Sequence, residues 1–164
     1  MIYFTGTVKK GDVFVENLIK TVQTHSEEET QFIAAEFAKT LKNGDFIAFF
    51  GDLGAGKTAF VRGMASVLTP GADVCSPTYA IVNEYHSDTA ALIHFDMYRI
   101  NDDDSLYMTG YYDYFDRYSQ KKCVYAVEWS ENIPFALPDC YYKISVSKSD
   151  GDTRNIDIYM IERE

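Results

Sequence analysis

The sequence predicts an α/β domain of three layers, with helices on both faces of a mixed, mostly parallel central sheet that carries antiparallel additions. Three observations support this prediction. The apolar run 46–50 has the length and composition of a strand buried on both faces. The glycine-rich stretch GDLGAGKT follows it directly at 51–58. Apolar residues then recur at helical spacing up to Leu68, before the stop signal Thr69-Pro70-Gly71.

Length and composition favour one compact domain over residues 1–164, because 46% of the 164 residues are hydrophobic. The formal net charge of −10 would repel a polyanion, so we expect no direct binding of nucleic acid. An apolar run of about 18 residues and a signal peptide are both missing from the sequence, which predicts a cytoplasmic protein without a membrane segment. The three cysteines lack CxxC spacing and predict neither a disulfide framework nor a zinc site.

Residues 1–23 are predicted to form an amino-terminal extension of edge strands, at 2–5, 13–15 and 18–22, with a turn at Gly11-Asp12. The S-x-x-E pattern from Ser26 to Glu29 is typical of a capping box and predicts a helix start. Apolar positions at helical spacing continue that helix through Leu41, and Asn43-Gly44 is predicted to end it.

Five more strands are predicted after the second helix, at 79–85, 91–95, 123–127, 141–146 and 156–161. The last two are joined by the polar turn 147–152. The acidic run 102–104 could be a metal cluster, but a solvated helix start is favoured because carboxylates suit the amino-terminal end of a helix dipole.

The stretch 51–58 matches the phosphate-loop pattern G-x-x-x-x-G-K-[ST] through Gly51, Gly56, Lys57 and Thr58, with a third glycine at Gly54. The glycines allow a tight turn that aims backbone N–H groups at a phosphate. Lys57 would contact the β- and γ-phosphates, and the Thr58 hydroxyl would bind Mg²⁺. A chance match on a glycine turn is the alternative, which the flanking strand and helix disfavour. The predicted fold is therefore P-loop NTPase-like.

Two acidic residues end predicted buried strands: Asp96 follows 91–95 and Glu128 follows 123–127. Both would emerge at the sheet edge where ligands bind, so one could hold Mg²⁺ while the other orients the attacking water. Each could instead be a surface carboxylate or a helix cap. His94 would share the strand face of Asp96, and a buried, hydrogen-bonded histidine beneath the site is favoured over a catalytic one.

The sequence contains no N-K-x-D tetrapeptide for guanine, so ATP/ADP is the expected nucleotide. Lid-type small-molecule kinases usually carry several arginines in the lid, whereas the five arginines here are scattered. A kinase is therefore disfavoured. A binding module gated by nucleotide without turnover is the third possibility.

A series of short motifs follows the phosphate loop in order: Ser76-Pro77-Thr78-Tyr79, Asn83-Glu84-Tyr85, His94-Phe95-Asp96-Met97-Tyr98-Arg99, Gly110-Tyr111-Tyr112-Asp113-Tyr114-Phe115 and Val127-Glu128-Trp129. This series resembles the TsaE family, also called YjeE, from about Thr24 to the final strand. The resemblance implies an Mg²⁺-dependent ATPase that acts with the TsaB-TsaD protein pair in threonylcarbamoyladenosine modification of tRNA.

The resemblance also implies roles for individual residues. Catalysis would fall to Lys57, Asp96 and Glu128, and the metal ligands would be Thr58, Asp96 and Glu128. The nucleotide would be bound by Glu27, Asp52, Leu53, Gly54, Ala55, Gly56, Lys57, Thr58, Thr78, Trp129 and Gly151, with Glu27 and Gly151 the weakest candidates. The segment 76–78 resembles the family's mobile threonine loop, although a purely structural Ser-Pro turn is the alternative. Cys75 departs from the polar or basic residue expected before that loop.

No arginine is placed by the sequence against the transferred phosphate, so we expect slow hydrolysis that a partner accelerates. A dense aromatic stretch is either a docking surface for that partner or packing against the sheet. Its members are Tyr107, Tyr111, Tyr112, Tyr114, Phe115 and Tyr118.

Overall fold

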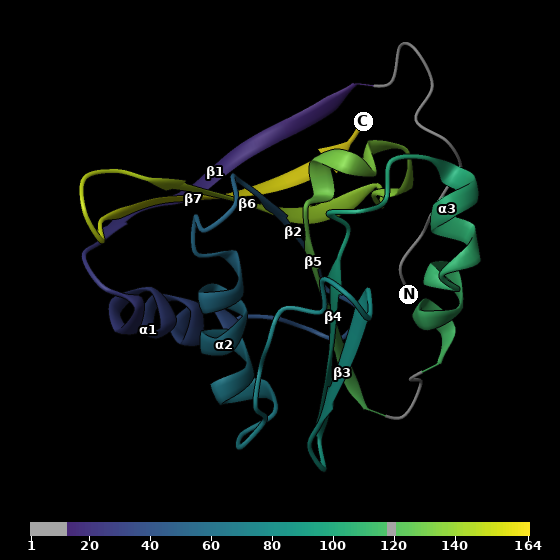
Figure 1. The fold of residues 1–164 in the computed structure, drawn as a ribbon, viewed down its shortest axis with the longest axis horizontal. Helices are drawn as coiled ribbons and strands as arrows, with labels where there is room; N and C mark the ends of the chain where they lie inside the picture. Colours follow the sequence, from purple (N-terminus) through teal and green to yellow (C-terminus); the bar gives the residue numbers. More distant parts are fainter. Residues whose placement is uncertain (1–12, 118–120) are drawn as a thin grey trace.

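The computed structural model describes residues 13–117 and 121–164 and has an α/β fold built on a seven-stranded sheet (Figure 1). The strands are β1 Phe14–Thr24, β2 Phe46–Phe50, β3 Val82–His86, β4 Ala90–Asp96, β5 Lys122–Glu128, β6 Cys140–Lys148 and β7 Arg154–Arg163. The helices are α1 Glu27–Ala38, α2 Lys57–Leu68 and α3 Asp103–Met108, with 3₁₀ segments at Tyr111–Asp116, Ser130–Asn132 and Pro134–Ala136. The predicted strand at 2–5 and the turn at Gly11-Asp12 lie outside the described residues.

The sheet has the strand order β1-β7-β6-β2-β5-β4-β3. Its four central strands, β6, β2, β5 and β4, run parallel to one another, whereas β7 pairs antiparallel with β6, β1 with β7, and β3 with β4. The prediction of a mixed sheet with antiparallel additions is therefore confirmed, but the sheet is not mostly parallel, because three of its six strand pairings are antiparallel. In the β4/β5 register Asp96 lies opposite Glu128, so both carboxylates leave the sheet at one edge.

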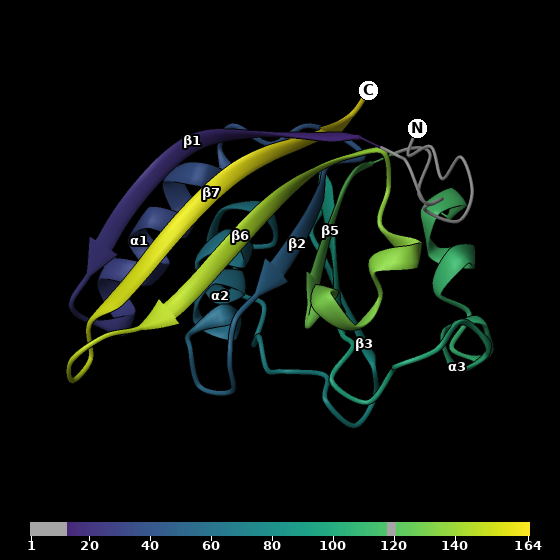
Figure 2. The same ribbon diagram turned by 90° about the horizontal axis from the view of Figure 1, so that it is seen from above.

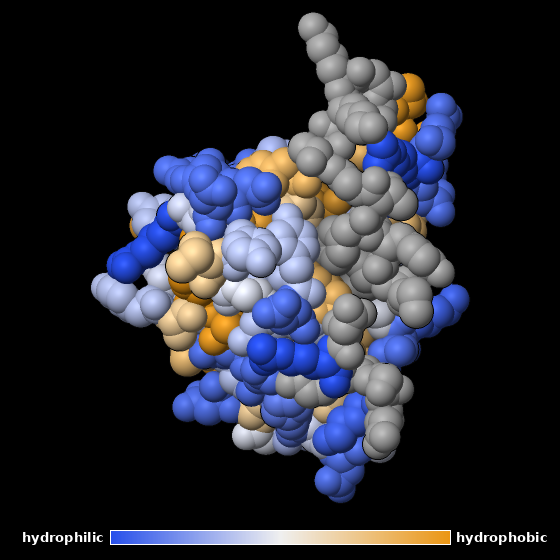
Figure 3. All heavy atoms as spheres, turned by 90° about the vertical axis from the view of Figure 1, so that its right-hand side faces the viewer, coloured by the Kyte–Doolittle hydropathy of each residue, from blue (hydrophilic) through white to orange (hydrophobic). Residues whose placement is uncertain are grey.

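Each face of the sheet is covered by different elements. Helices α1 and α2 lie together on one face (Figure 2), over a core that includes Ile47, Phe49 and Phe60. The 3₁₀ segments and the short helix α3 belong to the other face, whose core includes Phe46 and Phe95. Seen from the α3 side, the residues that are not grey are mostly hydrophilic, with small hydrophobic patches between them (Figure 3). The buried apolar side chains form two cores, one on each side of the sheet.

Helix α1 begins at the predicted cap, Ser26, although Glu29 bonds to the His25 N–H and not to the Ser26 N–H that a capping box uses. The Ser26 hydroxyl accepts a hydrogen bond from the Glu29 backbone N–H at 3.1 Å, and the Glu29 carboxylate accepts one from the His25 N–H at 2.7 Å. The prediction that the helix extends through Leu41 to Asn43-Gly44 was wrong, because α1 ends at Ala38. The chain tightens there into bonds between residues three apart, with the Leu41 N–H donating to the Ala38 carbonyl at 3.3 Å.

The two helices approach closely at Gly63 of α2. A Cβ atom added at Gly63 would lie 2.2 Å from the Gln31 carbonyl oxygen and 2.6 Å from the Ala34 Cβ of α1. Only a residue without a side chain fits this crossing.

Three predicted strands differ from the structure by more than a residue or two at an end. The stretches 13–15 and 18–22 belong to one continuous edge strand, β1, with a bulge between Leu18 and Lys20. The strand predicted at 79–85 begins only at Val82, because the Ile81 N–H closes a turn onto the Pro77 carbonyl at 2.6 Å and Ile81 has a φ of 71°.

The acidic run 102–104 forms a helix start, as predicted. Asp102 caps α3 by accepting a hydrogen bond from the Ser105 N–H at 2.7 Å. Within the described ranges, no helix is long and apolar enough to cross a membrane.

Candidate functional site

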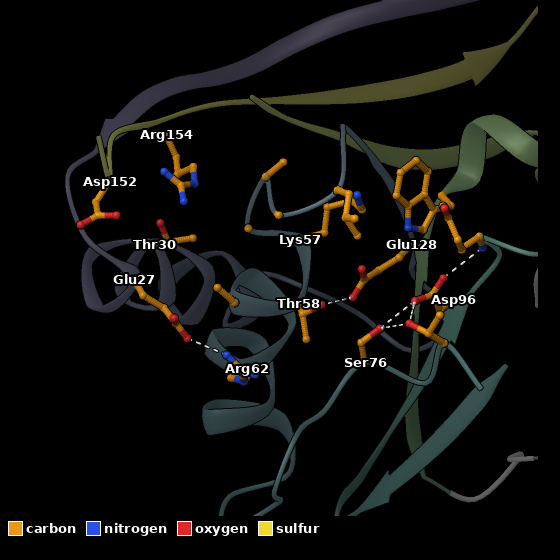
Figure 4. Close-up of a pocket in the computed structure, with 18 of the residues that line it drawn as sticks. Glu27, Thr30, Lys57, Thr58, Arg62, Ser76, Asp96, Glu128, Asp152 and Arg154 are labelled. Atoms are coloured by element: carbon orange, nitrogen blue, oxygen red, sulfur yellow. Dashed lines mark hydrogen bonds and ion pairs between the residues drawn. The ribbon is translucent and has the colours of Figure 1, made fainter. Parts of the chain in front are cut away.

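A pocket of about 670 Å³ opens between the 51–56 loop, the start of α1 and the turn that joins β6 to β7. Glu27, Thr30, Asp152 and Arg154 line one end of it (Figure 4). Lys57 and Thr58 lie in the middle, and a second set of polar residues, Ser76, Asp96 and Glu128, lines the other end. The pocket therefore extends from a region of mixed charge, past the glycine loop, to a pair of carboxylates.

The loop 51–56 owes its shape to glycines in the left-handed region. Gly51 has a φ of 135°, and a Cβ atom there would lie 2.2 Å from the Val146 carbonyl oxygen on β6. Gly56 has a φ of 114° and caps α2 with no side-chain hydrogen bond. The first N–H groups of α2 thus start directly at the pocket, where a helix amino terminus favours an anion.

Lys57 is folded back onto its own loop. Its Nζ donates hydrogen bonds to the carbonyl oxygens of Gly51 and, at 3.0 Å, Asp52, and it lies 4.0 Å from the centroid of the Trp129 ring. Only 4% of the residue is exposed. Burial lowers the pKa of the Lys57 ammonium, and the attraction of nearby carboxylates, Glu128 foremost, partly opposes that shift.

Two carboxylates form the far end of the pocket, and each is held by hydroxyl donors. Glu128 Oε1 accepts hydrogen bonds from the Thr58 hydroxyl at 2.7 Å and lies 2.8 Å from His94 Nε2. Asp96 Oδ2 accepts from the hydroxyls of Ser76 and Thr78, both at 2.7 Å.

This donor set fits a hard divalent cation. Asp96 and Glu128 are each 3% exposed, and in the described part of the chain neither forms an ion pair with a lysine or arginine. Buried carboxylates usually require a compensating charge, and Mg²⁺ prefers oxygen ligands with water and phosphate completing its shell. No cluster of three or more His, Cys, Asp or Glu side chains suited to a metal occurs in the described ranges, so the Thr58 hydroxyl would have to contribute.

The opposite end of the pocket contains two arginines to which the sequence analysis gave no position. Arg62 of α2 binds the Glu27 carboxylate at 2.6 Å and the Val74 carbonyl at 3.0 Å. Arg154 lies beside Gly56 and donates to the Thr153 carbonyl at 3.1 Å. The predicted turn 147–152 ends just before Arg154, but nothing in the sequence places that turn at the pocket.

Most predicted site residues line this one pocket: Glu27, Leu53, Gly54, Ala55, Gly56, Lys57, Thr58, Thr78, Asp96, Glu128 and Trp129. Asp52 and Gly151 are not among the lining residues. Their carbonyl oxygens instead accept hydrogen bonds from Lys57 and from Arg154, the latter at 3.4 Å.

Of the two alternatives for the aromatic stretch, packing against the sheet holds for Tyr111, which is completely buried in the core on the α3 side. Tyr112, Tyr114 and Phe115 are partly buried against the same core. Tyr107 alone of the described members is largely exposed, at 73%. Tyr118 lies outside the described residues.

The fold and the pocket define an α/β protein with a glycine-rich loop that shares a pocket with two strand-end carboxylates. A family model described as "Threonylcarbamoyl adenosine biosynthesis protein TsaE" matches residues 24–156. The chain therefore belongs to the TsaE family, as the motif series predicted.

Individual relatives agree. The "tRNA threonylcarbamoyladenosine biosynthesis protein TsaE" of Aquifex aeolicus is 37% identical over 145 residues, which cover 87% of this chain and 97% of that protein. The protein of the same name from Bacillus subtilis is 37% identical over 134 residues, covering 82% and 81%. The crystal structure of Bacillus subtilis YdiB superposes with a TM-score of 0.62 at 28% identity and covers 92% of this chain and 88% of that one.

Proposed function

We propose that this chain is a single-domain P-loop ATPase that binds ATP with Mg²⁺, hydrolyses it slowly, and acts with the TsaB-TsaD pair in threonylcarbamoyladenosine modification of tRNA. One observation carries the proposal. The glycine loop between β2 and α2 brings Lys57 and Thr58 into the same pocket as Asp96 and Glu128. Membership of the TsaE family supplies the pathway.

The chain's own groups can receive a triphosphate with few changes. The loop glycines and the first turn of α2 offer backbone N–H groups to the phosphate oxygens. Lys57 now satisfies its ammonium with two loop carbonyls. A phosphate is a stronger acceptor because it is charged, so Lys57 would rotate from those carbonyls to the β- and γ-phosphates.

Mg²⁺, when bound, would neutralise the charge that develops on the phosphate oxygens during transfer. Thr58, Asp96 and Glu128 are the residues that would hold it. Glu128 would also accept a hydrogen bond from the attacking water and so orient it. The hydroxyls of Ser76 and Thr78, which now bind Asp96, would keep that carboxylate directed at the pocket.

Slow turnover follows from the arginine positions. Arg62 is tied to Glu27 at the other end of the pocket, and Arg154 binds backbone carbonyls. In the described chain no arginine contacts Asp96 or Glu128. A missing arginine finger lowers phosphoryl-transfer rates by roughly a thousandfold or more, which a partner could restore.

The test is Mg²⁺-dependent phosphate release from ATP, measured with and without purified TsaB-TsaD pair. We compare the wild type with Lys57→Ala and Glu128→Gln, and use Lys39→Ala as the matched lysine control because Lys39 follows the far end of α1. The proposal predicts that the TsaB-TsaD pair stimulates phosphate release from ATP. Lys57→Ala and Glu128→Gln should lose this release, and Lys39→Ala should retain it.

Two results would contradict it. Nucleotide binding without phosphate release in any mixture would indicate a gated binding module. Phosphate that appears on an added small-molecule acceptor instead of in solution would indicate a kinase.

A further inference from the structure

His94 is buried directly behind the Glu128 carboxylate. It is 0% exposed, and its Nε2 lies 2.8 Å from Glu128 Oε1. It projects from β4 on the face of the sheet that α2 covers, two residues before Asp96. The ring therefore contacts a predicted metal ligand from the protein side and does not line the pocket.

The surroundings of the two ring nitrogens assign the proton. Nδ1 is buried and has no hydrogen-bond partner among the described residues. A proton on Nδ1 would be a buried donor without an acceptor, which is costly. A proton on Nε2 has Glu128 Oε1 as its acceptor, so the contact requires an Nε2–H group.

This donation fixes how Glu128 presents its two oxygens. Oε1 is occupied by the Thr58 hydroxyl and by His94. Oε2 has no hydrogen-bond partner among the described residues, but it is not one of the buried polar atoms that lack a partner. It is therefore accessible from the pocket that Glu128 lines. When a ligand draws the Thr58 hydroxyl away, His94 remains as the donor that holds the carboxylate in this orientation.

We propose that His94 is the positioning residue of the site: its Nε2–H holds Glu128 Oε1 and thereby directs Oε2 toward the reacting groups. The inference rests on the proposed function for its effect on turnover, whereas the hydrogen bond itself can be tested without nucleotide. Partners that orient a metal ligand typically change activity by about 10–100-fold when removed.

The first test is the ring nitrogen NMR spectrum of the nucleotide-free protein. The chain has three histidines, and the His94 signals are those lost in His94→Gln. We expect a protonated Nε2 whose resonance shifts in Glu128→Gln. A His94 ring with a bare Nε2 and a protonated Nδ1 would overturn the proposal, because such a ring cannot donate to Oε1.

The second test is steady-state ATP hydrolysis in the presence of the TsaB-TsaD pair. His94→Leu should lower kcat by about 10–100-fold with a KM for ATP within about twofold of the wild type. His94→Gln, whose amide can donate from a similar position, should recover most of that loss. His86→Gln is the matched control, because His86 lies at the end of β3 and does not line the pocket.

A double variant tests the contact without nucleotide, because Glu128→Gln has lost the phosphate release that a kinetic comparison would need. In urea unfolding, the losses of unfolding free energy in His94→Leu and Glu128→Ala should be less than additive in the double variant, since both changes remove the same hydrogen bond. Equal losses of kcat in His94→Leu and His94→Gln, or fully additive losses of unfolding free energy, would overturn the inference. If the wild type releases no phosphate, the proposed function is wrong. The NMR result would still show whether His94 Nε2–H donates to Glu128 Oε1.

Discussion

Lys57 and Trp129 face each other at the pocket: the ammonium lies 4.0 Å from the centroid of the indole ring. Tyr98 packs against the same indole with a centroid distance of 4.9 Å. A cation over an indole face is stabilised by the ring quadrupole, but a triphosphate offers the ammonium a stronger, fully charged partner. If the proposed nucleotide binds, Lys57 should therefore leave the indole for the phosphates.

The fluorescence of Trp129 should report that exchange, because it is the only tryptophan in the chain. Adding Mg²⁺ and ATP should change its emission as Lys57 leaves the ring. Lys57→Met should alter the emission of the nucleotide-free protein and abolish the nucleotide response, whereas Lys39→Met should behave as the wild type. An unchanged spectrum in nucleotide-free Lys57→Met would contradict the contact.

Burial of Lys57 should make stability depend on pH. Burial lowers the pKa of Lys57 in the folded protein below its ordinary value of 10.5. At a pH between the folded-state pKa and the unfolded-state pKa, the unfolded chain therefore binds more protons than the folded protein does. The free energy of unfolding should then rise with pH through that window. Relative to Lys57→Met, which lacks the titrating group, the wild type should gain stability from pH 7 to pH 10.

Urea unfolding at both pH values measures this difference, with Lys39→Met as the control for an exposed lysine. If the unfolding free energy of the wild type, relative to Lys57→Met, falls from pH 7 to pH 10, then folding raises the pKa of Lys57 and the prediction is wrong.

Gly51 and Gly71 should tolerate alanine very differently. Both have positive φ, 135° and 86°, but only the added Cβ at Gly51 meets backbone, 2.2 Å from the Val146 carbonyl oxygen, while that at Gly71 meets nothing within 4 Å. Gly71→Ala should cost about 1 kcal/mol of unfolding free energy from its backbone conformation. Gly51→Ala should cost about 3 kcal/mol or more and weaken nucleotide binding.

Equilibrium unfolding and ATP titration of the two alanine variants give the comparison directly. Equal costs would mean that the β6 carbonyl yields easily and that the loop is not confined by it.

Tyr111 and Tyr107 should separate core packing from surface contact. Tyr111 is 0% exposed and its hydroxyl donates to the Ala136 carbonyl at 3.3 Å, whereas Tyr107 is 73% exposed. Tyr111→Ala should lower the unfolding free energy by about 3–5 kcal/mol. Tyr107→Ala should change it by about 0.5 kcal/mol or less.

Thermal and urea unfolding check both values, and binding of each variant to the TsaB-TsaD pair tests the remaining docking idea. If Tyr107→Ala binds the pair as the wild type does, the exposed tyrosine is not part of that interface.

The parts of the fold that the sequence predicted well are those encoded by short local patterns. The buried run 46–50, the glycine loop and the Ser26 cap each depend on neighbouring residues, and all three occur as predicted. The strand-end position of Asp96 and Glu128 followed from apolar runs of the right length, and the parallel register then placed them side by side.

The features that escaped prediction depend on contacts between distant residues. Arg154 reaches the pocket only because β6 pairs with β2, which no local pattern reveals. The late start of β3 is an exception, because the turn that Ile81 closes onto Pro77 is local. The burial of Tyr111 depends on where α3 leads the chain, so an aromatic stretch alone could not distinguish core from surface.

The tight crossing at Gly63 has a mechanical consequence for the pocket. Because backbone of α1 lies where a Gly63 side chain would be, the two helices cannot slide past each other without separating, and they form one stiff wall. That wall carries Glu27 on α1 and Thr58 on α2. The pocket wall that α1 and α2 share should therefore keep its width, because sliding one helix along the other would bring their backbones into collision.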